Sequence, residues 1–503
     1  MKPKMFVVAA LLASIALCAF GQVPASSNSQ LNASSTQSSS GPFDKIWSVA
    51  KNQFNQSNQW ADSVTQLTNG TLVAVGGDGG NQPNSCPGFF GGAWTIAVTP
   101  AGGNVFQNLY SNCSNVGQWG IFVRSTTDGG FIFSGEDDST PLCFPCSWLA
   151  RFNSSGTIVW QENLTSFVGS GLNLKPTSDG GFMGVGWGQP SETGPTSGLI
   201  MKLSGNGAAQ WTELFTETAQ SFPGAIVNDG GGLHFNSIIP TPDGGDIVSG
   251  VADAKFSSGF AHVLVMMKLS STRSVQWARA YYSGTWGSWV PGNSLQYPVF
   301  LTADGGYVVS GTVETLTYPY KTLFFLMHVD AQGNVLWQKA YGGVNGSYDR
   351  SDGIGASATA DGGYILAGVS NIFLQEYDGW LLKTDAQGNI QWQKLYSGTE
   401  PSGSNTIVLN DVIETADGAY AVAGSSYVGS LSYGGPGFFI LKTDSQGNVG
   451  SCTSCAHATH TAVQALDLRG YNATFDQASP ALVFAGTNMR AKKTSVAPIT
   501  LFP

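Results

Sequence analysis

A phrase that recurs along the chain constrains the fold more than any other feature. It is clearest at residues 359–368, Thr-Ala-Asp-Gly-Gly-Tyr-Ile-Leu-Ala-Gly. Its turn residue recurs at intervals of 51 to 64 residues, with a degenerate first copy, as Asn69, Asp128, Asp179, Asp243, Asp304, Asp361 and Asp417. A unit of this length exceeds most helical solenoid repeats and matches one blade of a β-propeller with generous loops.

A second phrase follows each copy of the first. It is clearest at residues 380–392, and its final tryptophan recurs 31 to 34 residues after the turn aspartate, as Trp160, Trp211, Trp277, Trp337 and Trp392. The Asp-Gly-Gly and Asp-Ala-Gln-Gly-Asn stretches predict hairpin turns, because glycine accepts positive φ and aspartate bonds its own backbone. Each repeat therefore predicts four strands, and no helical period separates them.

The two ends of the repeat region complement each other. The seventh repeat has Ser451 where tryptophan is expected, so its outer strand is missing. Residues 43–51 precede the first repeat and resemble such an outer strand, with Trp47 matching Trp392. We predict an all-β, seven-bladed β-propeller of four-stranded blades, closed by the N-terminal strand, which removes an open sheet edge.

The segments before and after the repeats define the limits of the propeller domain. Lys2 and Lys4 precede an apolar run, which predicts a signal peptide over residues 1–21 and a secreted, periplasmic or cell-surface protein. Residues 22–42 are a polar, low-complexity linker, residues 43–451 the propeller, and residues 452–503 a Cys/His segment with a short β-rich tail. We expect the tail to add two or three strands or to act as a docking segment.

Composition narrows the range of partners. Charged residues are 11% of the chain, the formal net charge is −10, and the sequence contains no basic cluster. Nucleic acid and anionic membranes are therefore not expected as partners. After removal of the signal peptide no segment is apolar enough to span a membrane, and we expect a monomer.

Six cysteines outside the signal peptide are candidates for disulfides, which export permits. Cys86, Cys113, Cys143 and Cys146 fall in loops of the first two repeats, and their pairing is open. Cys452 and Cys455 lie beside His457 and His460, so a metal site is the alternative there. The spacing is too compressed for an ordinary zinc finger, which favours a local disulfide and no metal.

The paired phrases resemble the repeats of secreted bacterial propeller proteins, a large group mostly without assigned function. The second phrase is also similar to the tryptophan-docking turn of pyrroloquinoline-quinone-type propellers, which clips neighbouring blades together. Arg273 replaces the turn glycine in the fourth repeat and Pro100 the turn aspartate in the first. The quinone enzymes imply catalytic and calcium-binding carboxylates, but no position here matches them, so the resemblance implies the fold and no cofactor.

Aromatic residues in the long, uneven loops are the candidate ligand-binding residues. Both turn types belong on one edge of a propeller, so these loops share the other edge. They carry Trp119, Phe222, His234, Trp286, Trp289, Tyr297 and Tyr348. Grouped there, they would bind a glycan, peptide or protein, or form small cores within the loops. Asp62, Asn236, Asn410 and Asp411 are expected near the starts of inner strands, where they would line or simply solvate the central channel.

No catalytic motif is recognisable, so no catalytic residue is assigned. We therefore expect a secreted binding or interaction propeller rather than an enzyme. The alternatives are an extracellular enzyme, carbohydrate-active or a quinoprotein, with its site at the channel mouth, and a purely structural surface protein.

Overall fold

In the described residues of the computed structural model all regular secondary structure is β-strand, and none of it is a helix that could cross a membrane. The chain divides into residues 1–39 and residues 40–503, and everything described below belongs to the second unit. The described residues are 41–47, 59–81, 90–111, 118–137, 146–165, 172–189, 194–218, 221–223, 232–256, 259–283, 286–289, 298–316, 321–342, 351–371, 378–396, 406–427, 437–449, 456–458, 462–466, 468–473, 475–478, 480, 484–486 and 490–493.

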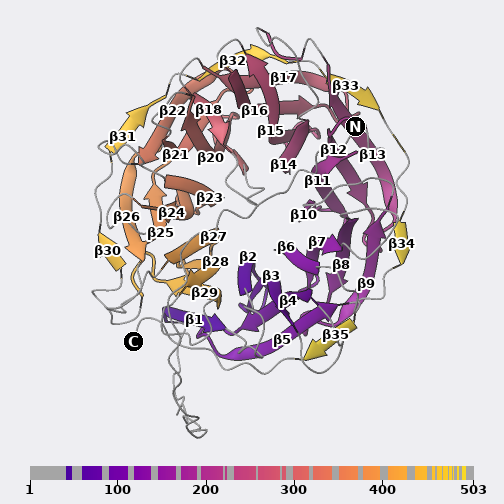
Figure 1. The fold of residues 1–503 in the computed structure, drawn as a ribbon, viewed down its shortest axis with the longest axis vertical. Helices are drawn as coiled ribbons and strands as arrows, with labels where there is room; N and C mark the ends of the chain where they lie inside the picture. Colours follow the sequence, from indigo (N-terminus) through magenta and orange to yellow (C-terminus); the bar gives the residue numbers. More distant parts are fainter. Residues whose placement is uncertain are drawn as a thin grey trace, which may run out of the picture. The chain divides into compact units, whose positions relative to one another are not determined.

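Seven antiparallel blades of four strands form a ring, as the repeats predict (Figure 1). From the centre outwards, blades 1 to 3 are β2 (Gln59–Gln66), β3 (Leu72–Asn81), β4 (Phe90–Val98), β5 (Asn104–Ser111); β6 (Gln118–Ser125), β7 (Phe131–Asp137), β8 (Cys146–Phe152), β9 (Ile158–Leu164); and β10 (Asn173–Pro176), β11 (Phe182–Gly188), β12 (Ser197–Leu203), β13 (Ala209–Glu217). Blades 4 and 5 are β14 (Leu233–Pro240), β15 (Asp246–Phe256), β16 (Gly259–Leu269), β17 (Val275–Tyr282); and β19 (Val299–Leu301), β20 (Tyr307–Thr315), β21 (Thr322–Val329), β22 (Val335–Gly342). Blades 6 and 7 are β23 (Ser351–Ala358), β24 (Tyr364–Ser370), β25 (Asp378–Thr384), β26 (Ile390–Tyr396); and β27 (Thr406–Glu414), β28 (Tyr420–Tyr427), β29 (Gly437–Thr443), β1 (Phe43–Trp47).

The Asp-Gly-Gly turn explains why the first phrase repeats. In blade 6, Asp361 accepts hydrogen bonds from the Gly363 amide at 3.0 Å and from Lys383 Nζ at 2.9 Å. Gly362 has a φ of +83°, a conformation in which a side chain would be strained. The carboxylate thus ties the turn to the third strand of the same blade.

The second phrase joins neighbouring blades. Trp392 on β26 lies against the turn of blade 7, where a Cβ on Gly447 would be only 2.7 Å from Trp392 Cζ3. Four residues later, the hydroxyl of Tyr396 donates to the Gly447 carbonyl at 2.7 Å. Two aromatic residues spaced by four therefore hold one glycine turn, which requires both its positive φ and its bare surface.

Arg273 is the described non-glycine residue with a positive φ, at +67°. Its guanidinium lies 4.9 Å from the ring centre of Trp211, and its Nε donates to Glu213 Oε1 at 3.0 Å. Stacking and an ion pair with a buried carboxylate accompany the unfavourable backbone conformation at this junction.

The predicted ring closure is confirmed, but the predicted register is wrong. β1 pairs with β29 of blade 7, and Phe43 rather than Trp47 lies opposite Lys442, as Trp392 lies opposite Lys383. Trp47 lies opposite Phe438, the place that Tyr396 takes in blade 6. Most outer strands carry two aromatic residues spaced by four, such as Trp392 and Tyr396 in blade 6. The observed register places Phe43 and Trp47 at these two positions.

The C-terminal segment departs from the two or three strands expected of it. It contributes six short strands, each antiparallel to the outer strand of a different blade (yellow in Figure 1). In chain order they pair with blades 6, 5, 4, 3, 2 and 1: β30 (Ala456–Ala458), β31 (Ala462–Ala465), β32 (Arg469–Asn472), β33 (Phe475–Ala478), β34 (Phe484–Gly486) and β35 (Arg490–Lys493). The tail is thus a belt that runs round the perimeter against the blade order.

Candidate functional site

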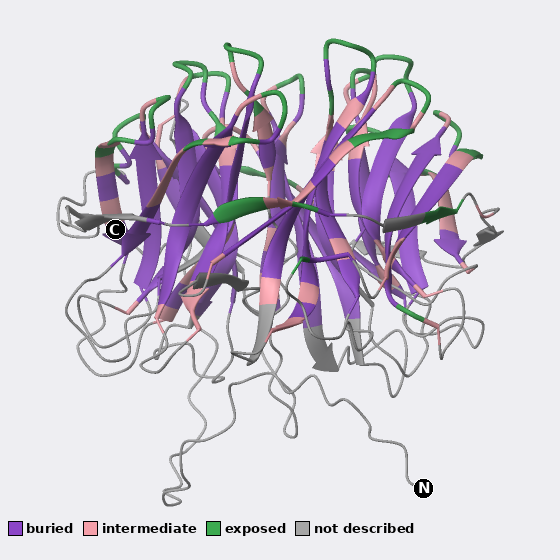
Figure 2. Ribbon diagram, turned by 90° about the horizontal axis from the view of Figure 1, so that it is seen from above, coloured by how far each residue is buried: buried purple, intermediate pink, exposed green. Residues whose placement is uncertain are grey.

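The two edges of the ring differ in what they carry. We call the edge with the short hairpin turns, such as residues 359–363 and 385–389, the turn rim, and the opposite edge the loop rim. Figure 2 shows the exposed turns along the upper edge and the buried strands between the two rims. The turns are fixed by repeated backbone hydrogen bonds, so variable chemistry belongs to the loop rim and the channel.

The structure places some of the sequence-predicted loop residues. His234 lies on β14 and is partly exposed, whereas Phe222 is 2% exposed within a hydrophobic cluster, which is the loop-core role left open above. Trp286 and Trp289 begin and end a short strand, β18 (Trp286–Trp289), and Trp119 lies on β6. The side chains of these three tryptophans, and all of Tyr297 and Tyr348, lie outside the described residues.

The predicted disulfides stay predictions. Cys146 is fully buried at the first position of β8. Cys86, Cys113, Cys143, Cys452 and Cys455 lie outside the described residues. In the described part of the chain, no group of three or more His, Cys, Asp or Glu residues is arranged to hold a metal ion.

A cluster of polar and aromatic side chains lies on the loop rim between blades 3 and 4. The rings of Trp187 and His234 are 5.2 Å apart between centres. Nearby on the same rim, His262 Nδ1 pairs with Asp253 Oδ1 across the β15–β16 hairpin, where both side chains are about two-fifths exposed. Strand β18 lies alongside, since Ser288 is opposite His262. We call Trp187, His234, Asp253 and His262 the rim cluster.

Charge at this cluster is set by burial and by the Asp253 carboxylate. Burial lowers the pKa of His234 to about 4, so this imidazole is neutral near pH 7. The hydrogen bond that His262 donates to the Asp253 carboxylate raises the pKa of His262. Glu217, at the end of β13, has its pKa raised to about 8 by burial and by Asp253. The rim therefore offers a tryptophan beside a neutral histidine, a hydrogen-bonded histidine–aspartate pair and a carboxyl group that is protonated near pH 7.

The central channel is shaped by bulges in the inner strands. In β2, β14 and β27 the pairing register shifts around Asp62, Asn236 and Asn410, which are three of the four residues predicted to line the channel. A bulge adds an unpaired residue and redirects its side chain, and bulges are common beside functional sites. The fourth, Asp411, directly follows its bulge.

Asp411 ties three inner strands together. Its Oδ2 accepts from Ser63 Oγ at 2.7 Å and from the Val64 amide at 3.1 Å, which joins blade 7 to blade 1. Arg124 of blade 2 reaches the same oxygen at 3.4 Å and donates to Ser63 Oγ at 2.8 Å. This network joins the last blade to the first two at the centre of the propeller, whereas β1 joins the two ends of the ring at the perimeter.

A cavity of about 140 Å³ lies in the channel, lined by residues from the inner strands of blades 2 to 7. Lys175 of β10 faces it and donates to Ser237 Oγ at 3.1 Å. Asn236 is 1% exposed, and neither atom of its amide has a described hydrogen-bond partner. Buried amides without partners are unusual in folded proteins, so this cavity is a candidate binding site.

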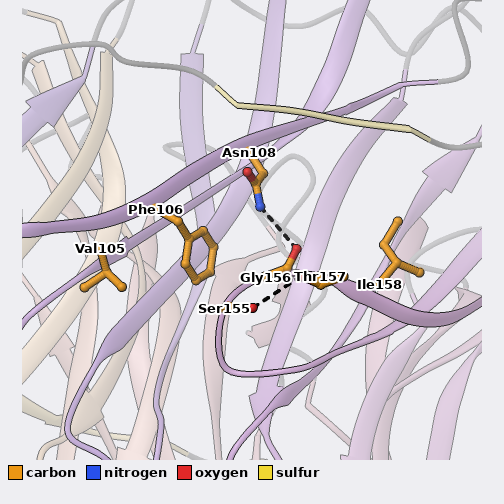
Figure 3. A pocket seen from close by; sticks show the side chains of 7 residues that line it. All are labelled: Val105, Phe106, Asn108, Ser155, Gly156, Thr157 and Ile158. Atoms are coloured by element: carbon orange, nitrogen blue, oxygen red, sulfur yellow. Dashed lines mark hydrogen bonds between the residues drawn. The ribbon is translucent and has the colours of Figure 1, made fainter.

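A larger groove, of about 510 Å³, lies between the outer strand of blade 1 and the β8–β9 turn of blade 2 (Figure 3). Phe106 stands there in the position that tryptophan takes in later blades, against Gly156. Asn108 Nδ2 donates to the Gly156 carbonyl at 3.1 Å. The groove is present because the phenylalanine side chain is smaller than the tryptophan found at later junctions. It is not lined by a set of convergent polar groups.

Comparisons with known proteins leave the function open. No family model matches the chain, and no curated protein matches it. A Dyadobacter fermentans DSM 18053 protein of unknown function has a similar structure at 9% identity and a TM-score of 0.38, covering 80% of this chain and 97% of that one. A proposed exo-beta-1,3-galactanase from Bifidobacterium bifidum s17 has a similar structure at 12% identity and a TM-score of 0.31, covering 57% of this chain and 90% of that one. At these scores neither likeness carries an argument.

Several residues of these sites escaped the sequence analysis. Arg124 and Lys175 stand two residues before the repeated Thr-x-Asp-Gly-Gly turn, where later blades have Ile239, Phe300, Ser357 and Ile413. That contrast was a usable signal for cations in the channel. Trp187, Asp253 and His262 lie on strands and hairpins rather than in the long loops, so no loop-based search finds them.

Proposed function

We propose that the protein is a secreted binding propeller whose ligand, a glycan, peptide or protein, contacts the loop rim around blades 3 to 5. The observation that carries this proposal is the rim cluster. It combines a partly exposed tryptophan–histidine pair with the Asp253–His262 pair within one region of the rim. Exposed rings beside a few placed polar groups are typical of recognition sites.

Strand β18 supports the same location. It pairs with β16 of blade 4 and with β20 of blade 5, which joins the two blades into one continuous sheet. Trp286 and Trp289 are therefore the first and last residues of a strand that pairs beside His262.

The test is retention of the chain without its first 21 residues on a panel of immobilised polysaccharides and peptides. Replacing Trp187 and His234 with alanine should weaken the binding affinity by ~2 kcal/mol, about thirtyfold in Kd, if the two residues contact the ligand. Leu336 and Val159 are 54% and 63% exposed on outer strands away from the rim, so alanine at both is the matched control. Equal retention of the two double variants would place the ligand elsewhere.

A second candidate function is an extracellular carbohydrate-active enzyme, and Glu217 favours it. Its carboxyl group is protonated near pH 7 because its pKa is raised to about 8, a property that a general acid requires. An enzyme would release sugar products from the panel and lose this activity in Glu217→Gln. Retention without any released product supports the binding function instead.

A further inference from the structure

The channel cavity contains an ammonium group for which the structure describes no ion pair. Lys175 Nζ bonds Ser237 Oγ, and the cavity-lining residues include one carboxylate, Asp411. That carboxylate already accepts from Ser63, Val64 and Arg124. A partly buried cation without a close counter-ion is disfavoured relative to its neutral form. Burial together with Arg124 lowers the pKa of Lys175 to about 7, against the opposing effect of Asp411.

The two side-chain amides beside it are also incompletely hydrogen-bonded. Asn236 is 1% exposed and Asn173 is 5% exposed, and both line the cavity. Asn173 Nδ2 donates to the Asn236 carbonyl at 2.9 Å, but its Oδ1 has no described partner, and neither has either atom of the Asn236 amide. A ligand atom that accepts a hydrogen bond from Asn236 Nδ2 would satisfy a buried donor that the protein leaves open.

We propose that this cavity binds the carboxylate end-group of a small ligand, with Lys175 as its charge partner and Asn236 as its hydrogen-bond donor. The cavity has two cations, Arg124 and Lys175, against one carboxylate, so an anion balances the charge. Its volume of about 140 Å³ suits an end-group rather than a chain. The proposal goes beyond the function at the loop rim, because it assigns a separate site in the channel.

Isothermal titration calorimetry with pairs of ligands that differ only in charge tests this directly. At pH 7, glucuronate should bind and glucuronamide should not, and N-acetylalanine should bind better than N-acetylalaninamide. Preference for the sugar acid would assign the site to acidic glycans, and preference for the amino acid would assign it to peptide C-termini. Equal binding of acids and amides, or no binding of either acid, would overturn the proposal.

Charge removal at Lys175 provides the second test. Lys175→Met keeps the alkyl stem and should weaken carboxylate binding at least tenfold. Lys339→Met is the matched control, since Lys339 bonds the turn of blade 6 on the outer perimeter. If Lys175→Met does not fold, mass spectrometry of lysine acylation in the wild-type protein replaces it. Glucuronate should protect Lys175 and leave Lys339 unprotected, and equal protection would contradict the assignment.

The pH dependence has a defined sign. Raising the pH from 7 to 9 deprotonates Lys175 and should weaken carboxylate binding by about 50-fold, because only the ammonium form attracts the anion. The charged groups facing Lys175 are Arg124 and Asp411. Asp62, whose pKa burial raises to about 8, titrates in the same interval near Asp411. The loss should therefore persist in Asp62→Asn, and its disappearance there would refute the role of Lys175.

The rim and channel proposals can fail independently. Alanine at Trp187 and His234 should leave glucuronate binding unchanged, because neither residue lines the cavity. A loss of polysaccharide retention with intact carboxylate binding supports two separate sites. Loss of both properties in that double variant would contradict a separate channel site.

Discussion

Replacing Phe106 with tryptophan should stabilise the protein, since an open groove lies at the junction between blades 1 and 2. A Cβ on Gly156 would lie 2.7 Å from Phe106 Cε2, and a Cβ on Gly207 would lie 3.0 Å from Trp160 Cε3 at the next junction. The two rings therefore occupy equivalent places. Trp160 Nε1 also donates to the Gly205 carbonyl at 2.9 Å, a bond that phenylalanine cannot make.

The magnitude follows from the added contact. Tryptophan would bury roughly 40 Å² more than phenylalanine, worth ~1 kcal/mol at ~25 cal/mol/Å². The indole hydrogen bond adds ~1 kcal/mol, and ordering the larger side chain subtracts part of it. We expect a net gain of about 1 to 2 kcal/mol, because the groove of about 510 Å³ leaves room for the ring.

Guanidinium unfolding of Phe106→Trp and the reciprocal Trp160→Phe measures both halves of the argument. The midpoint should rise in the first variant and fall by a similar free energy in the second. A fall in both would show that the groove is too tight for tryptophan. No change in Trp160→Phe would refute the claim that the docked indole stabilises a junction.

Three further predictions concern the ends of the chain and its turns. Phe43→Ala should cost about 3 kcal/mol and deletion of residues 22–52 more, because both open the last blade; an unchanged unfolding midpoint would refute ring closure by β1. Deleting residues 456–503 should lower the midpoint and promote aggregation by uncovering the outer strands, and a stable truncated monomer would count against a structural belt. Hydrogen bonds from Lys202, Thr177 and Gly181 hold the pKa of Asp179 well below its usual range. The stability that this turn contributes is therefore present above about pH 4 and is lost as the pH falls. This acid-dependent loss of stability should be smaller in Asp179→Asn.

The sequence predicted the ring because its repeats specify local chemistry. Within one blade, the turn at Asp361 and Gly362 is hydrogen-bonded to Lys383. Trp392 of the same repeat packs against the turn of the next blade. Each repeat therefore encodes both a hairpin and the junction to its neighbour. The missing outer strand of the last repeat likewise predicted the exchange of β1. The register of β1 could not be predicted from Trp47 alone, since most outer strands carry aromatic residues at two positions and Trp47 could be matched to either one.

The belt and the sites depend on contacts between distant segments. Strands β30 to β35 are short, three or four residues each, and gain their partners only from the perimeter that the closed ring presents. Asn236 and Asp62 were recognisable as polar residues near inner strands, but the bulges that turn them inward follow from pairing. The rim cluster brings together Trp187 and Asp253, which are 66 residues apart in the sequence and share no motif.

Hydrogen–deuterium exchange in the presence of the polysaccharide or peptide retained most strongly on the panel tests the central claim most directly. Binding at the loop rim predicts slower exchange at residues 185–189, 232–236 and 286–289, with residues 360–363 and 386–389 of the turn rim unchanged. Protection confined to the turn rim, or to the perimeter covered by residues 456–493, would contradict the proposed binding surface.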